Sequence, residues 1–108
     1  NLVSAESKKD GKSYHKDPDE KIFRLKQETY LLELLTNIGA TLPTILKEDD
    51  FNKAMQVLAS LRGPIDAYFE NVTVNTDDLI LRDNRLRLLS LVVTTINTVA
   101  DFSVIEDS

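Results

Sequence analysis

Residues 61–105 decide the fold of this chain. The segment begins Leu-Arg-Gly-Pro-Ile-Asp-Ala-Tyr-Phe-Glu-Asn-Val at residues 61–72 and continues Thr-Asp-Asp-Leu-Ile-Leu-Arg-Asp-Asn-Arg-Leu at residues 76–86. Beyond residue 79, apolar residues recur mostly three or four positions apart, which is the spacing of an amphipathic helix. They are Ile80, Leu81, Leu86, Leu89, Val93, Ile96 and Ala100. The pattern predicts a long last helix that begins at Thr76 or Asp77.

Part of this predicted helix has the composition of a strand. Residues 92–99 read Val-Val-Thr-Thr-Ile-Asn-Thr-Val, and all but the Asn are β-branched. Such residues favour strands, but they cost a helix only tenths of a kcal/mol each. The flanking residues have a helical period, so we predict helix here as well.

An earlier helix-start signal is Asp17-Pro18-Asp19-Glu20. Asp17 is placed to cap, Pro18 suits the first helical position, and the carboxylate of Glu20 can reach back to the cap. Apolar residues then follow at helical spacing, with Tyr30 widening the same face. Since Gly39 is a typical helix stop, the first helix is predicted over residues 19–38.

Two shorter helices are expected next. Residues 41–48 contain a Pro and read as a connector or a single turn, after which Asp49 or Asp50 caps a helix that ends near Leu61. The pair Gly63-Pro64 ends that helix and starts a third, which carries Ile65, Tyr68, Phe69 and Val72 on one side. Residues 72–75 are expected to be extended.

These elements predict an all-α fold, a bundle of about four main helices with short connections. At 108 residues the chain is one domain. Residues 17–108 are expected to form it. Residues 1–16 are polar and rich in Lys and Ser, with no apolar period, and read as a flexible linker from a preceding domain.

The composition offers little for catalysis. The chain has no Cys, one His and three Gly. Without Cys it can form neither a thiolate metal site nor a disulfide. One His and three Gly leave little for a histidine-based catalyst or a loop that cradles a phosphate. Its His15 lies in a polar stretch. No run of residues approaches the roughly 20 apolar positions that span a bilayer, and the first residues are not an apolar signal. We therefore expect no catalytic residue, no metal site and no membrane partner.

The net charge of −5 argues against general nucleic-acid binding, DNA included, because nonspecific affinity comes from neutralising phosphates. Residues 1–16 carry four Lys against two acidic residues, whereas residues 61–108 carry four Arg against eight. Any contact with RNA must be local.

Two motifs resemble the C-terminal end of the bacterial glycyl-tRNA synthetase beta subunit. The family's Leu-x-x-Leu-Arg-x-Pro-Ile/Val-Asp-x-Phe-Phe-Asp-x-Val is matched by Leu58, Leu61, Arg62, Pro64, Ile65, Asp66, Phe69 and Val72. Its Asp-Asp-x-x-Leu-Arg-x-Asn-Arg-Leu-x-Leu-Leu is matched by Asp77, Asp78, Leu81, Arg82, Asn84, Arg85, Leu86, Leu88 and Leu89. A closing Val-Ala-Asp-Phe-Ser stands at residues 99–103. Tyr68 replaces the usual Phe, Glu70 the frequent Asp and Ile80 the usual Ala.

The resemblance implies a domain of the helical anticodon-binding class named for an Asp-Ala-Leu-Arg stretch. It implies a role in holding the anticodon arm of the tRNA for glycine, within a bacterial, cytoplasmic enzyme that joins glycine to that tRNA. The chemistry, with ATP and Mg²⁺, would belong to the alpha subunit of an α2β2 assembly. In this family a segment similar to residues 1–4 closes a helix of the preceding domain. Without the rest of that helix, residues 1–4 are expected to be loose.

The candidate RNA-binding residues lie near the start of the last predicted helix and on the second predicted helix. They are Arg82, Asn84, Arg85 and Arg87, with Arg62 and Lys53. Anticodon loops present unstacked bases that a few Arg, Asn or aromatic side chains can stack on or hydrogen-bond.

The same residues also admit a structural interpretation. Arg62, Asp66, Arg82 and Arg85 could form ion pairs, and Asp77 and Asp78 could cap the last helix. In that case the RNA surface would lie elsewhere, around Lys47 and Lys53. Two other functions stay open: a module for subunit assembly, and the related domain of arginyl-tRNA synthetase.

Overall fold

The computed structural model describes the backbone of residues 2–107 and the side chains of residues 2–101. Its helices are α1 (Leu2–Asp10), α2 (Lys26–Lys47), α3 (Phe51–Asn71) and α4 (Leu79–Asp107), with one 3-10 turn, η1 (Glu20–Ile22), before α2. No strand occurs within residues 2–107, so the predicted all-α fold is confirmed. Phe102 and Ser103 of the closing segment lie outside the described side chains.

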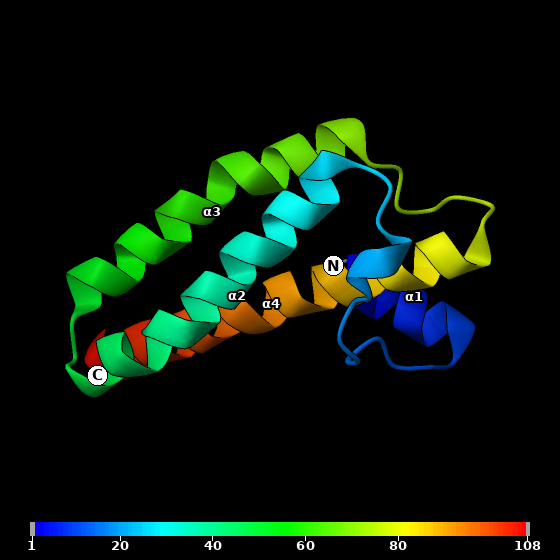
Figure 1. Cartoon of the computed structure of the whole chain (residues 1–108). Coiled ribbons are helices and arrows are strands. Elements are labelled where there is room, and N and C mark those ends of the chain that lie inside the picture. The colour runs from blue at the N-terminus through cyan, green and yellow to red at the C-terminus, as the bar shows by residue number, and fades with distance from the viewer. Residues whose placement is uncertain (1, 108) are drawn as a thin grey trace.

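The helices form a hairpin with a long helix beside it. α2 and α3 run antiparallel, and α4 packs along both (Figure 1). α1 lies against the first half of α4, at the end of the molecule where the chain passes from α3 into α4 (Figure 1). The turn between α2 and α3 lies at the opposite end.

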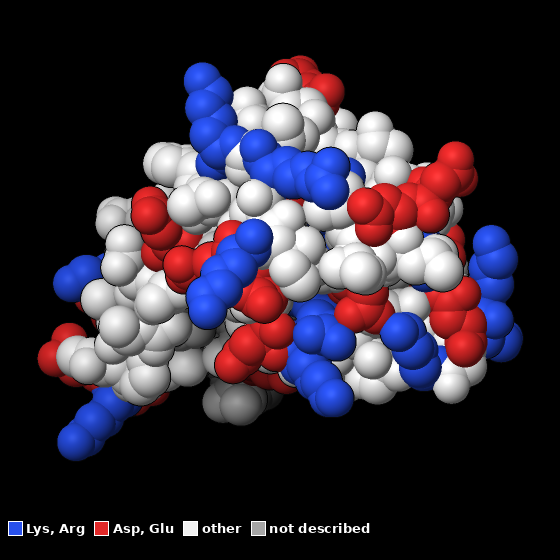
Figure 2. All heavy atoms as spheres, turned by 45° about the vertical axis from the view of Figure 1, so that its right-hand side comes forward, with Lys and Arg blue, Asp and Glu red and all other residues white. Residues whose placement is uncertain are grey.

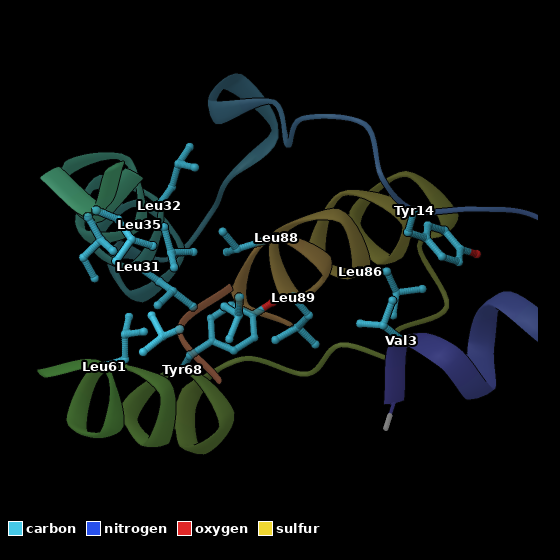
Figure 3. Packing of buried hydrophobic residues seen from close by; sticks show 14 of the residues in the cluster. Val3, Tyr14, Leu31, Leu32, Leu35, Leu61, Tyr68, Leu86, Leu88 and Leu89 are labelled. Atoms are coloured by element: carbon cyan, nitrogen blue, oxygen red, sulfur yellow. The ribbon is translucent and has the colours of Figure 1, made fainter. Parts of the chain in front are cut away.

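The core fills the space between α2, α3 and α4, and a smaller part of it reaches α1 (Figure 3). On α3 the buried residues are Ala54, Leu61 and Tyr68, seven positions apart and therefore on one line of the helix. Val3 of α1 and Tyr14 of the following loop cover Leu86 of α4 (Figure 3). The other buried apolar residues of the three long helices are Leu31, Leu32, Leu35, Ile38, Leu42, Ile45, Leu81, Leu88, Leu89, Val92 and Val99.

The β-branched segment is helical, as predicted. Val92 and Val99 are buried in the core, so packing offsets the small propensity cost. The hydroxyls of Thr94, Thr95 and Thr98 donate to the carbonyls four residues earlier, at 2.8–3.0 Å. These bonds satisfy the Thr side chains inside the helix.

The first long helix differs from its predicted range. Asp19, not Asp17, accepts a hydrogen bond at a helix start, and it caps only the short η1 turn. α2 begins at Lys26, where Glu28 Oε1 accepts from the backbone N–H groups of Arg24 and Leu25, both at 3.2 Å. The helix then continues through Gly39 and Pro43 to Lys47, because Leu42 and Ile45 beyond these residues belong to the core.

The two middle helices of the prediction are one helix. Asp50 caps it as expected, accepting from the backbone N–H of Lys53 at 3.1 Å. α3 then runs through Gly63 and Pro64 to Asn71. Proline inside a helix removes a hydrogen bond and costs about 3 kcal/mol. Burial of Leu61 before it and Tyr68 after it holds the two halves in one line.

Residues 2–10 form a helix, which corrects the expectation of a loose, irregular segment at residues 1–16. Gly11 ends α1 with a φ of 65°, and the Lys12 N–H donates to the Ser7 carbonyl at 3.2 Å, the bond of a glycine-terminated helix. The sequence signal for this helix end was Lys8-Lys9-Asp10-Gly11. The segment was misread because its stabilising partners lie more than sixty residues away, on α4.

Candidate functional site

Arg82, a candidate for RNA contact, is occupied by partners within the protein. Its Nη2 is paired with Glu6 and lies 2.8 Å from Asp10 Oδ2. Its Nη1 donates to the Tyr14 hydroxyl at 3.3 Å, and its Nε donates to Asn75 Oδ1 at 2.9 Å. The side chain is 13% exposed. Arg82 therefore fastens α1 and its loop to the start of α4.

The electrostatics of this cluster, which we call the α1 clasp (Glu6, Asp10, Tyr14, Asn75 and Arg82), agree with that role. The hydrogen bond from the Tyr14 hydroxyl, followed by that from Arg82, holds the pKa of Asp10 below its ordinary value. Burial raises the pKa of Tyr14. The hydrogen bond to Asp10 leads the causes that raise the pKa of Arg82, so this guanidinium stays charged throughout the working pH range.

Asn84 is also turned inward. Its Nδ2 donates to the Asp19 carbonyl at 3.0 Å, and its Oδ1 accepts from the Asp19 N–H at 2.6 Å. Both ends of the amide are used, and the residue is 2% exposed. Asn84 anchors the loop before α2 to α4 and is too deeply buried to contact a base.

Arg85 forms a buried ion pair with Glu28 of α2. The Arg85 Nη2 and Nε atoms lie 3.2 Å and 3.4 Å from the two carboxylate oxygens, and Nη1 donates to the Thr73 carbonyl at 2.7 Å. The side chains are 7% and 0% exposed. Glu28 also caps α2, so this pair joins α2, α4 and the segment before α4.

Tyr68 lies beside this buried pair with its hydroxyl unbonded. The residue is 0% exposed, and its hydroxyl contacts no hydrogen-bonding group among the described residues. Burial, and after it the charge of Glu28, raises the pKa of Tyr68. Its ring packs edge-on against Phe69, with 5.6 Å between centroids.

Arg87 is half-buried and paired with Asp83 one turn earlier, at 2.9 Å. Asp83 also holds Lys12, at 2.6 Å, and the Lys12 ammonium lies over the Tyr14 ring, 5.2 Å from its centroid. A partly exposed pair on one helix contributes little to stability, so breaking it costs little. Arg87 could thus turn toward a phosphate, unlike Arg82 and Arg85.

Arg62 and Lys53 on α3 are exposed, and their side chains make no ion pair or hydrogen bond with the part of the chain that is described. The two are nine residues apart, which places them about 180° apart around the helix. They do not share a face. Lys47, at the last turn of α2, is exposed as well.

Of the four acidic residues Asp17, Asp66, Asp77 and Asp78, Asp78 makes a capping bond within the described part of the chain. Its Oδ1 accepts from the N–H groups of Ile80 and Leu81 at 3.1 and 3.2 Å, so α4 begins at Leu79 rather than at Thr76 or Asp77. Asp17, Asp66 and Asp77 are exposed, and none has a side-chain partner among the residues described.

Two hollows lie along the seam between α2 and α3, and the sequence did not indicate either. The larger, about 470 Å³, is near the α2–α3 turn, with Thr41, Thr44, Gln56 and Ser60 on its walls and Lys53 at its edge. The smaller, about 290 Å³, lies between the first turns of α2 and the second half of α3.

The smaller hollow is lined by Lys26, Gln27, Tyr30, Pro64 and Ala67. Tyr30 was placed on the apolar face of its helix by its spacing, yet its side chain is 58% exposed in the structure. The face of α2 that packs against α3 and α4 is narrower than its sequence suggests. Tyr30 stands at the edge of that face.

The face seen in Figure 2 has no extended patch of a single charge sign. Figure 2 shows Lys and Arg side chains interspersed with Asp and Glu on the face in view. No group of three or more His, Asp or Glu suited to a metal ion occurs among the described residues. None of the described helices has the length and apolar content needed to cross a membrane. The candidate site is therefore a set of small, separate contacts on α2 and α3.

Comparison with known proteins places the chain in a family. Residues 2–103 match the model of the DALR anticodon binding domain, and the chain belongs to that family. Similar curated proteins are glycine–tRNA ligase beta subunits: 46% identical over 107 residues in Rhodospirillum centenum, 41% over 106 in Ruegeria sp. and 39% over 106 in Cereibacter sphaeroides. Each alignment covers 98% of this chain but 15% of the relative, so the chain spans about a seventh of their length. No solved structure matches it.

Proposed function

We propose that this chain holds the anticodon arm of the tRNA for glycine, as one domain of a glycine–tRNA ligase beta subunit. The observation that carries the proposal is the family match over residues 2–103 together with relatives of that name. ATP, Mg²⁺ and the joining reaction belong to an alpha subunit in an α2β2 assembly, in the bacterial cytoplasm. The domain itself contributes binding and no catalytic group.

The charges of the chain support local contact rather than broad attraction. Two of its five arginines are held inside the protein, and the net charge is −5. The remaining exposed cations suit the phosphates and the unstacked bases of a bent loop. Other parts of the enzyme would supply the rest of the phosphate affinity.

Charge reversal on α3 tests this proposal in the complete enzyme. Arg62→Glu and Lys53→Glu are each expected to raise the KM for tRNA several-fold. Each replaces an exposed cation with a carboxylate, which repels the phosphates of the RNA. Formation of glycyl-adenylate, which needs no tRNA, is expected to stay unchanged. Lys16→Glu, the same change in the loop before α2, is the control.

The function and the individual residues are tested separately. Replacing the anticodon bases of the tRNA should raise KM for the unchanged enzyme, and an enzyme indifferent to those bases would overturn the proposed function. Unchanged tRNA kinetics in both α3 variants would instead remove Arg62 and Lys53 from the contact surface.

Exposed apolar residues favour subunit assembly as a second candidate. Met55 and Phe69 on α3 are 41% and 51% exposed, and Leu79 and Ile80 at the start of α4 are 73% and 68% exposed. Deleting residues 17–108 and measuring the mass of the enzyme separates the two functions. Loss of the assembly, rather than selective loss of tRNA affinity, would favour this candidate.

A further inference from the structure

The smaller hollow on the α2–α3 seam has walls suited to a flat ring. Tyr30 of α2 forms one side, and Pro64 and Ala67 of α3 form the other. In Figure 1 this is the region where the start of α2 lies beside the second half of α3. Its volume, about 290 Å³, is at the lower end of the range for small-ligand sites. It accommodates one ring system rather than a length of chain.

The lining of this hollow is mainly apolar, and its polar residues are Gln27 and Lys26 beside Tyr30. Gln27 has an amide that can both donate to and accept from the edge of a base. Lys26 is exposed and has no carboxylate partner among the described residues, which leaves its ammonium for a phosphate. The Tyr30 hydroxyl likewise bonds to no group in the described part of the chain, and the residue is 58% exposed, so its ring is accessible to a base.

Pro64 adds a second reason to regard the hollow as a built site. A proline inside a helix is costly, yet α3 carries it without a break. Its rigid ring lies on the wall of the hollow, opposite Tyr30. Residues that break a local rule while the fold stays intact are often found at functional sites.

We propose that this hollow receives one unstacked base of the anticodon loop. Tyr30 stacks on the base against Pro64, Gln27 contacts the base edge, and Lys26 contacts the neighbouring phosphate. The inference rests on the proposed function and deepens it by naming where a base is bound. It differs from the candidates of the sequence, none of which lines this hollow.

The test uses the complete enzyme and transcripts of the tRNA for glycine. Tyr30→Ala is expected to raise the KM for tRNA about tenfold, within what stacking of one base contributes. Tyr30→Phe keeps the ring and is expected to stay within about twofold of the unchanged enzyme. Formation of glycyl-adenylate and the thermal midpoint should be the same in both variants.

Phe69→Ala is the matched control. Phe69 is an aromatic residue of similar exposure, 51% against 58% for Tyr30. It stands five residues beyond Pro64, about 140° round α3 from the hollow. Its removal is expected to leave the KM for tRNA unchanged. A tRNA with a replaced anticodon supplies the second control, since Tyr30→Ala should then add no further loss.

The outcomes distinguish this inference from the proposed function. If the unchanged enzyme responds to the anticodon but Tyr30→Ala does not alter KM, the hollow is not a base site and the function stands. If Tyr30→Ala lowers the mass of the assembly and leaves tRNA kinetics intact, the hollow is a protein contact. If the unchanged enzyme ignores the anticodon, the proposed function itself fails.

Discussion

The start of α4 and the α2–α3 hairpin use their charged residues in opposite ways. At the start of α4, Arg82 and Arg85 are held by carboxylates from α1 and α2, and are at most 13% exposed. On the hairpin, Arg62, Lys53 and Lys26 are exposed without such partners in the described part of the chain. The arginines that best identify the family thus hold the fold together. The surface that we propose for the tRNA lies on the hairpin.

Arg85→Ala is expected to have the largest effect on stability. It leaves the Glu28 carboxylate buried without its cation, and breaking a buried pair on one side costs about 3–5 kcal/mol. Urea denaturation of the 108-residue chain measures this. The double variant Glu28→Gln with Arg85→Met removes both charges and should recover part of the loss. A loss below about 1 kcal/mol for Arg85→Ala would contradict the buried pair.

Arg82→Ala is expected to cost less, about 2 kcal/mol, because the carboxylate of Asp10, unlike that of Glu6, is 25% exposed and can be rehydrated. The effect should be local. Amide hydrogens of α1 should exchange faster, while those of α2 and α3 keep their protection. Arg87→Ala, which removes the half-exposed pair with Asp83, is the control and should cost less than about 1 kcal/mol.

Acid should release the α1 clasp before the rest of the fold. The pKa of Asp10 is lowered in the folded state, so the folded state binds its proton less readily than the unfolded chain does. The resulting stabilisation is complete above the ordinary pKa of an Asp and is lost as the pH falls toward the lowered value. Denaturation midpoints at several pH values below about 5 measure this. Asp10→Asn should flatten the decline, and an unchanged slope would exclude Asp10 as its source.

Tyr68→Phe is expected to raise stability by about 1 kcal/mol or less, since it removes a buried hydroxyl that has no partner. The ring and its edge-on contact with Phe69 remain. Tyr68 lies on α3 beside the buried Arg85–Glu28 pair, so it connects the α2–α3 hairpin with the start of α4. A marked loss of stability in Tyr68→Phe would show that the hydroxyl is bonded in solution.

Arg62→Gln should change stability least, within about 0.5 kcal/mol in either direction. The side chain is exposed and bonds to no described group. If the same denaturation experiment shows a large loss of stability, Arg62 is a structural arginine like Arg82 and Arg85. The contrast between the hairpin and the start of α4 would then fail for this residue.

The sequence predicted the fold class and most helical segments because apolar spacing is a local property of the chain. It indicated the α4 helix through seven β-branched residues. It offered Asp49 or Asp50, and Asp77 and Asp78, as caps, and of these Asp50 and Asp78 cap helices in the structure. It misplaced the ends of α2 and divided α3 in two, since Gly39, Pro43 and Pro64 are helix breakers by local preference. Burial of residues on both sides of each breaker overrides that preference.

By itself, then, the sequence determined that this chain is an all-α member of an anticodon-binding family. Both signals, the helical period and the spacing of the motifs, are properties of the order of residues along the chain. Tertiary structure alone decided which charges are free. Whether an arginine meets solvent or a carboxylate depends on residues as distant as Glu6 and Arg82, which no local pattern relates. It also placed Tyr30 and Pro64 across one hollow, because only the packing of α2 on α3 brings those two residues together.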